Sequence, residues 1–254
     1  MLESVFTLIN KKILITGASS GLGRVIAIEA SRAGATVDIT GRNQERLNQT
    51  FSQLDTSQGQ EHRSFVFDLT DLNKIGQIDF SNSSYDGIVL AAGINKIIPF
   101  TFLTSEVIEN VMHSNFTGNV LLLQRVIREK IFHKKGAVVF VSSINGTNVG
   151  SKGHTVYAAS KGAINGIMRT LANELSRFSI RVNAVSPGLI DSGMIDQNSE
   201  ILSQDGFKEY MKKYPLGIGK PEDVAYCCIY LLSDASRWIT GQALVIDGGL
   251  SINN

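Results

Sequence analysis

Short apolar runs alternate with helical patterns from one end of this 254-residue chain to the other. The apolar runs lie at about 13–15, 35–40, 64–67, 87–91, 137–141, 180–185 and 243–246, and the helical patterns at about 23–33, 44–54, 71–78, 105–132, 157–178 and 221–233. Strands that are apolar along their whole length are typical of a parallel sheet covered by helices on both faces. The alternation predicts an α/β fold: a single doubly wound (Rossmann-type) domain over residues 1–254 with a seven-stranded parallel sheet.

One stretch inside the chain, 189–215, lacks clear periodicity. It is polar and longer than an ordinary connection, and loops of that size are usually functional lids or lack regular structure. We therefore expect a substrate lid at about 189–215. Its apolar side chains either line the lid or only pack the loop against the domain, and they are Met194, Ile195, Phe207 and Tyr210.

Charge and cysteine content argue against several classes of function. The net charge of +1 gives no reason to expect nucleic acid or an anionic membrane as a partner. No apolar run reaches the roughly 18–20 residues that span a bilayer. Cys227 and Cys228 are neighbours in a helical pattern, where side chains point about 100° apart, so a disulfide between them is implausible. We expect a cytoplasmic protein with two core or near-core thiols. No residue spacing indicates a metal site.

A glycine-rich turn joins the first apolar run to the first helical pattern. Free N–H groups in the first turn of a helix attract a phosphate, and glycine lets the backbone approach a pyrophosphate or adopt positive φ. A turn without a ligand is the alternative, but a position in the first βα unit of a doubly wound sheet favours a dinucleotide. The predicted cofactor contacts in this turn are Gly17, Ser19, Ser20, Gly21, Leu22 and Gly23.

The residues that follow the second predicted strand indicate which dinucleotide is bound. An NAD enzyme would carry a carboxylate for the ribose hydroxyls at Gly41, eighteen residues past Gly23. No acid stands there, and the guanidinium of Arg42 suits a 2′-phosphate. Asp38 lies three residues earlier, so alternation along the strand points it to the opposite face. We predict NADP(H) in preference to NAD(H), and the alternative is that Arg42 is an ordinary solvated side chain.

Further cofactor contacts follow the third and fourth predicted strands. Asp68, with Leu69 after it, is placed to accept a hydrogen bond from the adenine amino group. The alternative is that Asp68 caps the helical segment that begins at Asp71. Ala92 and Gly93 end the fourth strand and are expected to let the cofactor backbone pass closely.

Tyr157 and Lys161 are four residues apart in a helical pattern, so they share one face about one turn apart. That spacing alone is weak, but Ser143 ends the fifth predicted strand, at the edge where ligands meet an open α/β sheet. Reducing a carbonyl requires a proton donor, and the ordinary phenol pKa of about 10 is high for that task. An ammonium about 5 Å away, at an effective dielectric of about 20, stabilises phenolate by roughly 3 kcal/mol, or about two pKa units. We therefore expect a lowered pKa for Tyr157, and the alternative is an ordinary half-buried aromatic side chain.

Together these motifs resemble the short-chain dehydrogenase/reductase family, and most closely its 3-oxoacyl-(acyl-carrier-protein) reductase group. The resemblance covers nearly the whole chain and rests on the glycine-rich turn, Asp68-Leu69, Asn115, Ser143, Tyr157, Lys161, Ser186-Pro187-Gly188-Leu189-Ile190 and the terminal Asp247-Gly248-Gly249. It implies the same doubly wound fold and a nicotinamide cofactor.

The resemblance also implies roles for individual residues. Tyr157 would be the acid/base, and Lys161 would bind the nicotinamide ribose and tune the phenol. Ser143 would polarise the substrate carbonyl, and Asn115 would hold a water that links Lys161 to solvent. The further cofactor contacts that it implies are Ala91, Ala92, Gly93, Pro187, Gly188 and Ile190. It also implies a homo-oligomer, a tetramer or dimer, with the helices at 105–132 and 157–166 in the interface. The alternative for the small residues at 157–166 is that they pack on the sheet of their own chain.

Two features depart from the family pattern. Leu90-Ala91 stands where the family has two asparagines, which removes side-chain hydrogen bonds near the centre of the sheet. The stretch from Asp68 to Leu90 is short, so we expect a truncated third helix. A neighbour of the catalytic pattern is also open to two interpretations: His154 either lines the substrate mouth or is a surface loop histidine.

The chemistry that fits these residues best is an NADPH-dependent reduction of a carbonyl to a secondary alcohol, by hydride transfer with proton donation from tyrosine. A 3-oxoacyl thioester is one candidate substrate. The alternative among enzymes is an NAD(P)-dependent dehydrogenase of a sugar, polyol or steroid-like alcohol. Enoyl reduction is disfavoured, because the related enoyl reductases place Tyr and Lys farther apart. A non-catalytic dinucleotide-binding sensor or scaffold would predict an eroded catalytic set, whereas Asn115, Ser143, Tyr157 and Lys161 are all present.

Overall fold

A parallel sheet of seven strands forms the centre of the protein, in the order β3-β2-β1-β4-β5-β6-β7. The computed structural model describes residues 5–80, 83–191 and 204–252, without the side chains of 204, 205, 207 and 208. The strands are β1 (Lys12–Ile15), β2 (Thr36–Gly41), β3 (Arg63–Val66), β4 (Tyr85–Leu90), β5 (Phe132–Val141), β6 (Arg181–Pro187) and β7 (Ala243–Ile246). All neighbouring strands are parallel, so the predicted doubly wound α/β fold is confirmed.

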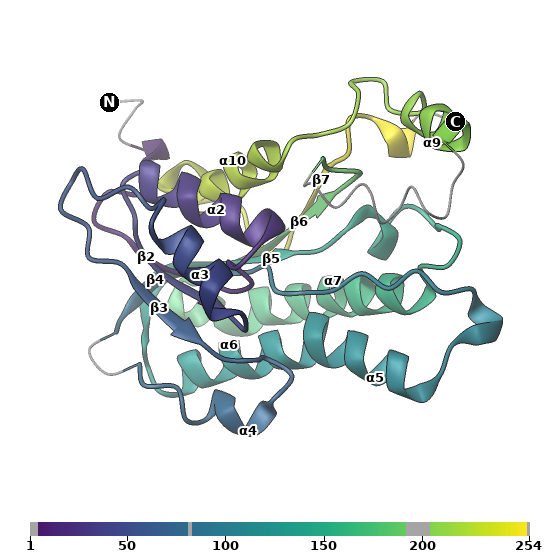
Figure 1. Ribbon diagram of the computed structural model, residues 1–254. Coiled ribbons are helices and arrows are strands. Elements are labelled where there is room, and N and C mark those ends of the chain that lie inside the picture. Colours follow the sequence, from purple (N-terminus) through teal and green to yellow (C-terminus); the bar gives the residue numbers. More distant parts are fainter. Residues whose placement is uncertain (1–4, 81–82, 192–203, 253–254) are drawn as a thin grey trace.

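Helices cover both faces of the sheet (Figure 1). One face carries α2 (Gly21–Arg32), α3 (Gln44–Phe51) and α10 (Pro221–Leu232), and the other carries α4 (Leu72–Ile75), α5 (Ser105–Met112), α6 (Gly118–Arg128) and α7 (Thr155–Leu175). A wider turn of the π type, η2 (His113–Thr117), joins α5 to α6. α9 (Gln204–Met211) lies in the stretch predicted as a lid, whereas residues 192–203, which include Met194 and Ile195, lie outside the described residues.

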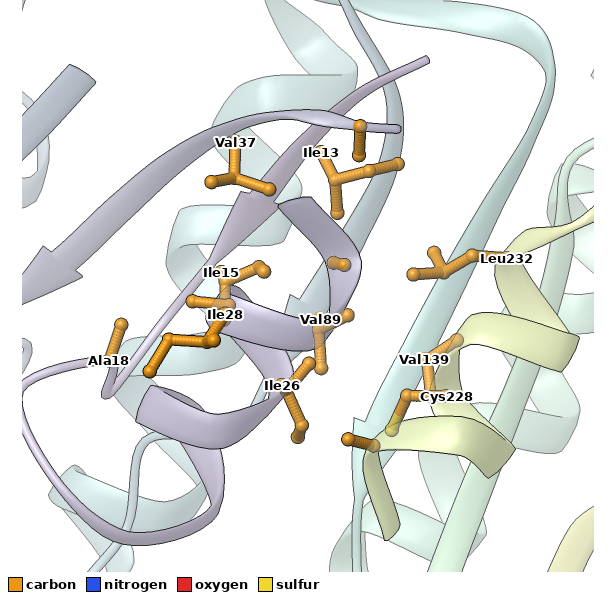
Figure 2. Packing of buried hydrophobic residues seen from close by; sticks show 14 of the residues in the cluster. Ile13, Ile15, Ala18, Ile26, Ile28, Val37, Val89, Val139, Cys228 and Leu232 are labelled. Atoms are coloured by element: carbon orange, nitrogen blue, oxygen red, sulfur yellow. The ribbon is translucent and has the colours of Figure 1, made fainter. Parts of the chain in front are cut away.

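The core has two parts because successive side chains of a strand point to opposite faces. In β1, Ile13 and Ile15 pack toward α2 and α10, whereas Leu14 packs toward α6 and α7. Figure 2 shows the first part, with apolar side chains of the sheet against α2 and with Cys228 reaching down from α10. Neither Cys227 nor Cys228 forms a disulfide. Burial on both faces explains why the strands are continuously apolar in the sequence.

The predicted helix at 105–132 is wrong in its extent. α6 ends at Arg128, Lys130 takes a left-handed φ of 58°, and β5 begins at Phe132. A residue in the left-handed region ends a helix even where the apolar spacing would allow another turn. The helix predicted at 44–54 also ends early, at Phe51. α4 has only four residues, which confirms the truncated third helix.

A buried carboxylate of β2 links the amino ends of β1, β3 and β4. Asp38 is fully buried, and its Oδ2 accepts hydrogen bonds from Arg63 Nη2 at 2.6 Å and from the Tyr85 hydroxyl at 2.7 Å. Lys12 Nζ lies 3.3 Å from the same oxygen. Burial and the neighbouring carboxylate raise the pKa of Tyr85. The prediction that Asp38 faces away from the cofactor side of β2 is therefore confirmed.

Candidate active site

A crevice of about 650 Å³ opens at the carboxyl ends of the central strands. Ligands of doubly wound sheets bind at this edge, where the strand order reverses between β1 and β4. Every site residue predicted from the sequence except Asn115 lines the crevice: Gly17, Ser19, Ser20, Gly21, Leu22, Gly23, Arg42, Asp68, Leu69, Ala91, Ala92, Gly93, Ser143, Tyr157, Lys161, Pro187, Gly188 and Ile190.

The glycine-rich turn forms one wall of the crevice. Gly17 and Gly21 have φ values of 70° and 54°, which favour glycine. A Cβ on Gly17 would lie 2.7 Å from the Ala92 Cα, so the turn packs directly on the chain that leaves β4. Ser20 is the N-cap of α2, but its side chain makes no capping hydrogen bond. The first N–H groups of α2 therefore remain available to an anion such as a pyrophosphate.

Two arginines border the crevice beyond the end of β2. A Cβ on Gly41 would lie 2.9 Å from the Ser19 Cβ, so a carboxylate at position 41 requires Ser19 to move. The Arg42 side chain is 63% exposed, and its Nη1 lies 3.8 Å from Asp68 Oδ2. Arg46, in the first turn of α3, lines the same region and was missed in the sequence. The sequence feature that could have identified Arg46 is its spacing of four residues from Arg42.

Asp68 is not a helix cap. Its Oδ1 accepts hydrogen bonds from the backbone N–H of Thr70 at 2.9 Å and from the Thr70 hydroxyl at 2.8 Å, which is a local Asx turn. The cap of α4 is Asp71, whose side chain accepts from Lys74 N. The capping alternative is therefore wrong for Asp68, and its Oδ2 remains beside Arg42 at the wall of the crevice.

Ser143, Tyr157 and Lys161 come together beyond β4, at the end of the crevice next to β5 and α7. Tyr157 and Lys161 lie on consecutive turns of α7, and Ser143 follows β5. The Ser143 hydroxyl lies beside the phenol of Tyr157 and favours its ionised form. Lys161 Nζ donates to the Val141 carbonyl at 2.7 Å and lies 5.6 Å from the centre of the Tyr157 ring. A hydroxyl, a phenol and an ammonium thus share one small region.

The pKa of the phenol shifts in the direction opposite to the one predicted. Burial raises the pKa of Tyr157, and the neighbouring Ser143 hydroxyl offsets this only in part. Burial lowers the pKa of Lys161 to about 8. The prediction considered the attraction between ammonium and phenolate but left out the cost of removing the phenolate from water, which is the larger effect here.

Asn115 lies behind the wall of the crevice. It is fully buried in η2, and its Oδ1 accepts a hydrogen bond from Ile94 N at 2.7 Å. Its Nδ2 donates to the Ile94 carbonyl and to Ser160 Oγ, both at 3.0 Å. Asn115 therefore fixes the chain that follows β4 onto α7. The water contact implied by the family resemblance stays a prediction.

The loop after β4 also reaches the catalytic end of the crevice. The ring of His154 packs edge-on against the ring of Tyr157 at 5.9 Å, and its Nε2 lies 3.4 Å from Asn95 Nδ2. These contacts place His154 beside Tyr157, but His154 itself does not line the crevice, so its place at the substrate mouth stays a prediction. Asn95 and Lys96 line the crevice and were missed in the sequence. The sequence feature that could have identified them is their position shortly after the fourth predicted strand.

The segment that leaves β6 is anchored along the crevice. Leu189 N donates to the Tyr214 hydroxyl at 3.2 Å, and Gly188 N donates to the Ile246 carbonyl at 3.1 Å. The ring of Tyr210 packs edge-on against that of Tyr214 at 5.7 Å. Among the apolar side chains expected in the lid, Tyr210 therefore packs against the domain, through its contact with Tyr214.

The described ranges contain neither a membrane-spanning helix nor a cluster of metal ligands. No helix there combines the length and the apolar character that crossing a membrane requires. No three side chains of the His, Cys, Asp and Glu types gather there as ligands of a metal ion would.

The sequence is similar to known reductases over almost its full length. A family model described as "Enoyl-(Acyl carrier protein) reductase" matches residues 17–251. The chain is 35% identical to the 3-oxoacyl-(acyl-carrier-protein) reductase FabG of Chlamydia trachomatis over 252 residues, which are 96% of this chain and 98% of that protein. It is 32% identical to the FabG of Aggregatibacter actinomycetemcomitans over 247 residues, 95% of this chain and 99% of that protein.

The fold is similar to solved dehydrogenase structures. A candidate short-chain alcohol dehydrogenase from Sinorhizobium meliloti superposes with a TM-score of 0.90 at 28% identity, covering 98% of this chain and all of that chain. A candidate 2-deoxy-D-gluconate 3-dehydrogenase from Agrobacterium tumefaciens, solved with bound NADP, superposes with a TM-score of 0.83 at 27% identity, covering 97% of this chain and 98% of that one. The chain therefore belongs to the short-chain dehydrogenase/reductase family and is an NAD(P)-dependent oxidoreductase acting on CH–OH and C=O groups.

Proposed function

We propose that this protein is an NADPH-dependent reductase that converts a 3-oxoacyl thioester to the corresponding secondary alcohol. The observation that carries the proposal is the meeting of Ser143, Tyr157 and Lys161 in one crevice with Arg42 and Arg46. The serine, tyrosine and lysine suit proton donation to a carbonyl oxygen. The two arginines suit a phosphate on the cofactor.

The residues of the chain fit a nicotinamide dinucleotide. The uncapped start of α2 borders the crevice and suits the pyrophosphate. Arg42 and Arg46 would hold the 2′-phosphate, and the lack of a side chain at Gly41 leaves Ser19 room beside them. Asp68 would accept from the adenine amino group. The NADP bound in the Agrobacterium tumefaciens structure supports the same choice of cofactor.

Each catalytic residue has a separate task in this proposal. The bound nicotinamide supplies the hydride. Tyr157 gives its phenol proton to the carbonyl oxygen, and the raised pKa keeps the phenol protonated at neutral pH until that step. Ser143 donates a hydrogen bond that orients the same oxygen. Lys161, charged below its pKa of about 8, stabilises the phenolate that remains.

Two substrate classes compete. The FabG relatives support a 3-oxoacyl thioester. A sugar-type alcohol is the second candidate, because a structural relative is described as a 2-deoxy-D-gluconate 3-dehydrogenase. The family model is described as an enoyl reductase, but the spacing of four between Tyr157 and Lys161 favours carbonyl chemistry.

We also propose that residues 189–215 form a substrate lid and that the protein is a homo-oligomer.

The test is the oxidation of NADPH by the purified protein with a 3-oxoacyl thioester, a sugar ketone and an enoyl thioester. We expect the highest kcat/KM for the 3-oxoacyl thioester. NADH in place of NADPH should lower kcat/KM at least about tenfold, or ~1.4 kcal/mol. Equal values with the two cofactors refute the preference, and a higher value for the enoyl or the sugar substrate refutes the substrate class.

A further inference from the structure

A short turn on the helix of Tyr157 and Lys161 holds the hydroxyl of Ser143. The turn is η3 (Ile144–Gly146), and the backbone N–H of Asn145 donates to Ser143 Oγ at 3.2 Å. The oxygen thus accepts from the backbone while the hydroxyl proton remains to be donated. In the structure that hydroxyl lies beside the phenol of Tyr157. The position of the turn therefore decides where the Ser143 proton points.

The turn packs on α7 more closely than a side chain would allow. A Cβ on Gly146 would lie 2.6 Å from the carbonyl carbon of Lys161 and 2.7 Å from Gly162 N. Backbone therefore contacts backbone at the turn of α7 that carries Lys161. Ser142 Oγ adds a hydrogen bond of 3.2 Å to the carbonyl oxygen of Lys161.

Asn165 adds a side-chain bond from the next turn of α7. Its Nδ2 donates to the carbonyl oxygen of Gly146 at 3.2 Å, and the residue is 3% exposed. Its Oδ1 is buried and has no hydrogen-bond partner in the described part of the chain. A buried amide oxygen without a partner costs stability relative to an apolar side chain. Packing alone therefore does not explain an asparagine at this position. Buried polar atoms without a hydrogen-bond partner are rare in native proteins, so a further role for Asn165 is expected.

We propose that Asn165 is a positioning residue that holds η3 on α7 through the Gly146 carbonyl, and so aims the Ser143 hydroxyl at the oxygen that Tyr157 protonates. Asn165 does not line the crevice, so its effect must pass through the turn. The inference rests on the proposed function, because it requires Ser143 and Tyr157 to act on a substrate carbonyl.

A double-mutant cycle between Asn165 and Ser143 tests this role. We expect Asn165→Ala to lower kcat roughly tenfold, with the KM for NADPH unchanged to within about twofold. In a Ser143→Ala background, the same substitution should change kcat by less than about twofold, because the hydroxyl to be aimed is already gone. Equal losses in the two backgrounds overturn the proposal.

Asn183 provides the matched control. It is also buried, and it bonds the Ile239 carbonyl at 2.9 Å and Gln242 N at 3.1 Å, away from Ser143. We expect Asn183→Ala to lower the melting temperature at least as much as Asn165→Ala but to keep kcat within about twofold. If it lowers kcat as far as Asn165→Ala does, the effect is a general loss of stability and the positioning role is wrong. If Asn165→Ala does not fold, as judged by near-UV circular dichroism, Asn165→Val carries the same cycle.

Tyr157→Phe separates the two possible failures. Full turnover by Tyr157→Phe refutes the proposed function itself. Loss of turnover in Tyr157→Phe, together with additive effects of Asn165→Ala and Ser143→Ala, refutes only the positioning role.

Discussion

The ammonium nitrogen of Lys161 lies 5.6 Å from the centre of the Tyr157 ring, while its hydrogen bond goes to the Val141 carbonyl. Burial acts on the two groups in the same sense, because each is pushed toward its neutral form. It raises the pKa of Tyr157 and lowers that of Lys161 to about 8. The pair therefore holds a phenol that keeps its proton beside an amine that releases its own easily.

Replacing Tyr157 by phenylalanine should remove the proton donor and little else. We expect Tyr157→Phe to lower kcat for carbonyl reduction about 10²–10⁴-fold, the usual contribution of a general acid. The dissociation constant for NADPH, measured by fluorescence titration, should change by less than about threefold, because the phenol is not the main anchor of the nucleotide. Turnover within tenfold of the wild type would contradict the assignment.

Lys161 should make the stability of the protein depend on pH. Its pKa is lowered in the folded state, to about 8 from an ordinary 10.5, so the unfolded chain binds more protons between these values. Stability should therefore rise with pH through this window. Relative to Lys161→Met, the free energy of unfolding of the wild type should increase by up to about 3 kcal/mol from pH 8 to pH 10.5.

Urea unfolding of both proteins at several pH values measures this difference. Comparing the two proteins removes groups common to both, including Tyr157. If the difference in unfolding free energy between the wild type and Lys161→Met stays constant or falls as the pH rises, burial does not destabilise the charged form of Lys161. Lys161→Met should also be inactive as a reductase, because no charge remains to stabilise the phenolate.

Changing Gly41 alone should not turn the protein into an NADH enzyme. A side chain at position 41 meets Ser19, whose Cβ lies 2.9 Å from the place of the new Cβ. We expect Gly41→Asp to lower kcat/KM for both cofactors, and Gly41→Asp with Ser19→Gly to recover activity with NADH. Arg42→Ala should lower the preference for NADPH about tenfold or more, because a charged bond to phosphate is lost.

Kinetics with both cofactors for the three proteins check this prediction. Arg32→Ala is a suitable control, since that arginine pairs with Glu29 and does not line the crevice. Efficient use of NADH by Gly41→Asp without a change at Ser19 would contradict the steric argument.

Asp38 should be important for stability and not for cofactor binding. Asp38→Asn leaves Arg63, Lys12 and Tyr85 without the carboxylate that they share. Breaking a buried ion pair typically costs about 3–5 kcal/mol, and because both cations are partly exposed we expect about 2–4 kcal/mol. Thermal unfolding should show a melting temperature lower by roughly 5–15 °C.

Asp234 offers a matched comparison, because its pair with Lys11 at 2.6 Å is exposed. Asp234→Asn should cost less than about 1 kcal/mol. Equal losses of stability in Asp38→Asn and Asp234→Asn would contradict the importance of burial. A weaker affinity for NADPH in Asp38→Asn would contradict its separation from the crevice.

The sequence was sufficient for the architecture and for much of the site. Apolar runs separated by helical patterns determined a parallel sheet with two covered faces, because such strands are stable only when both faces are buried. The spacing between Tyr157 and Lys161 placed both on one side of α7, since the helical repeat is local. The glycine-rich turn likewise has positive φ values at Gly17 and Gly21.

Only the tertiary structure decided what depends on neighbours far along the chain. The end of α6 and the early start of β5 follow from a left-handed residue, Lys130, that no apolar pattern reveals. The raised pKa of Tyr157 results from burial by segments from several parts of the chain. The distance along the sequence between Tyr157 and Lys161 contains no information about that burial. The bond from Asn165 to Gly146 joins two elements nineteen residues apart. Local periodicity determines which face a residue occupies, whereas desolvation and close backbone contact arise only when distant segments pack together.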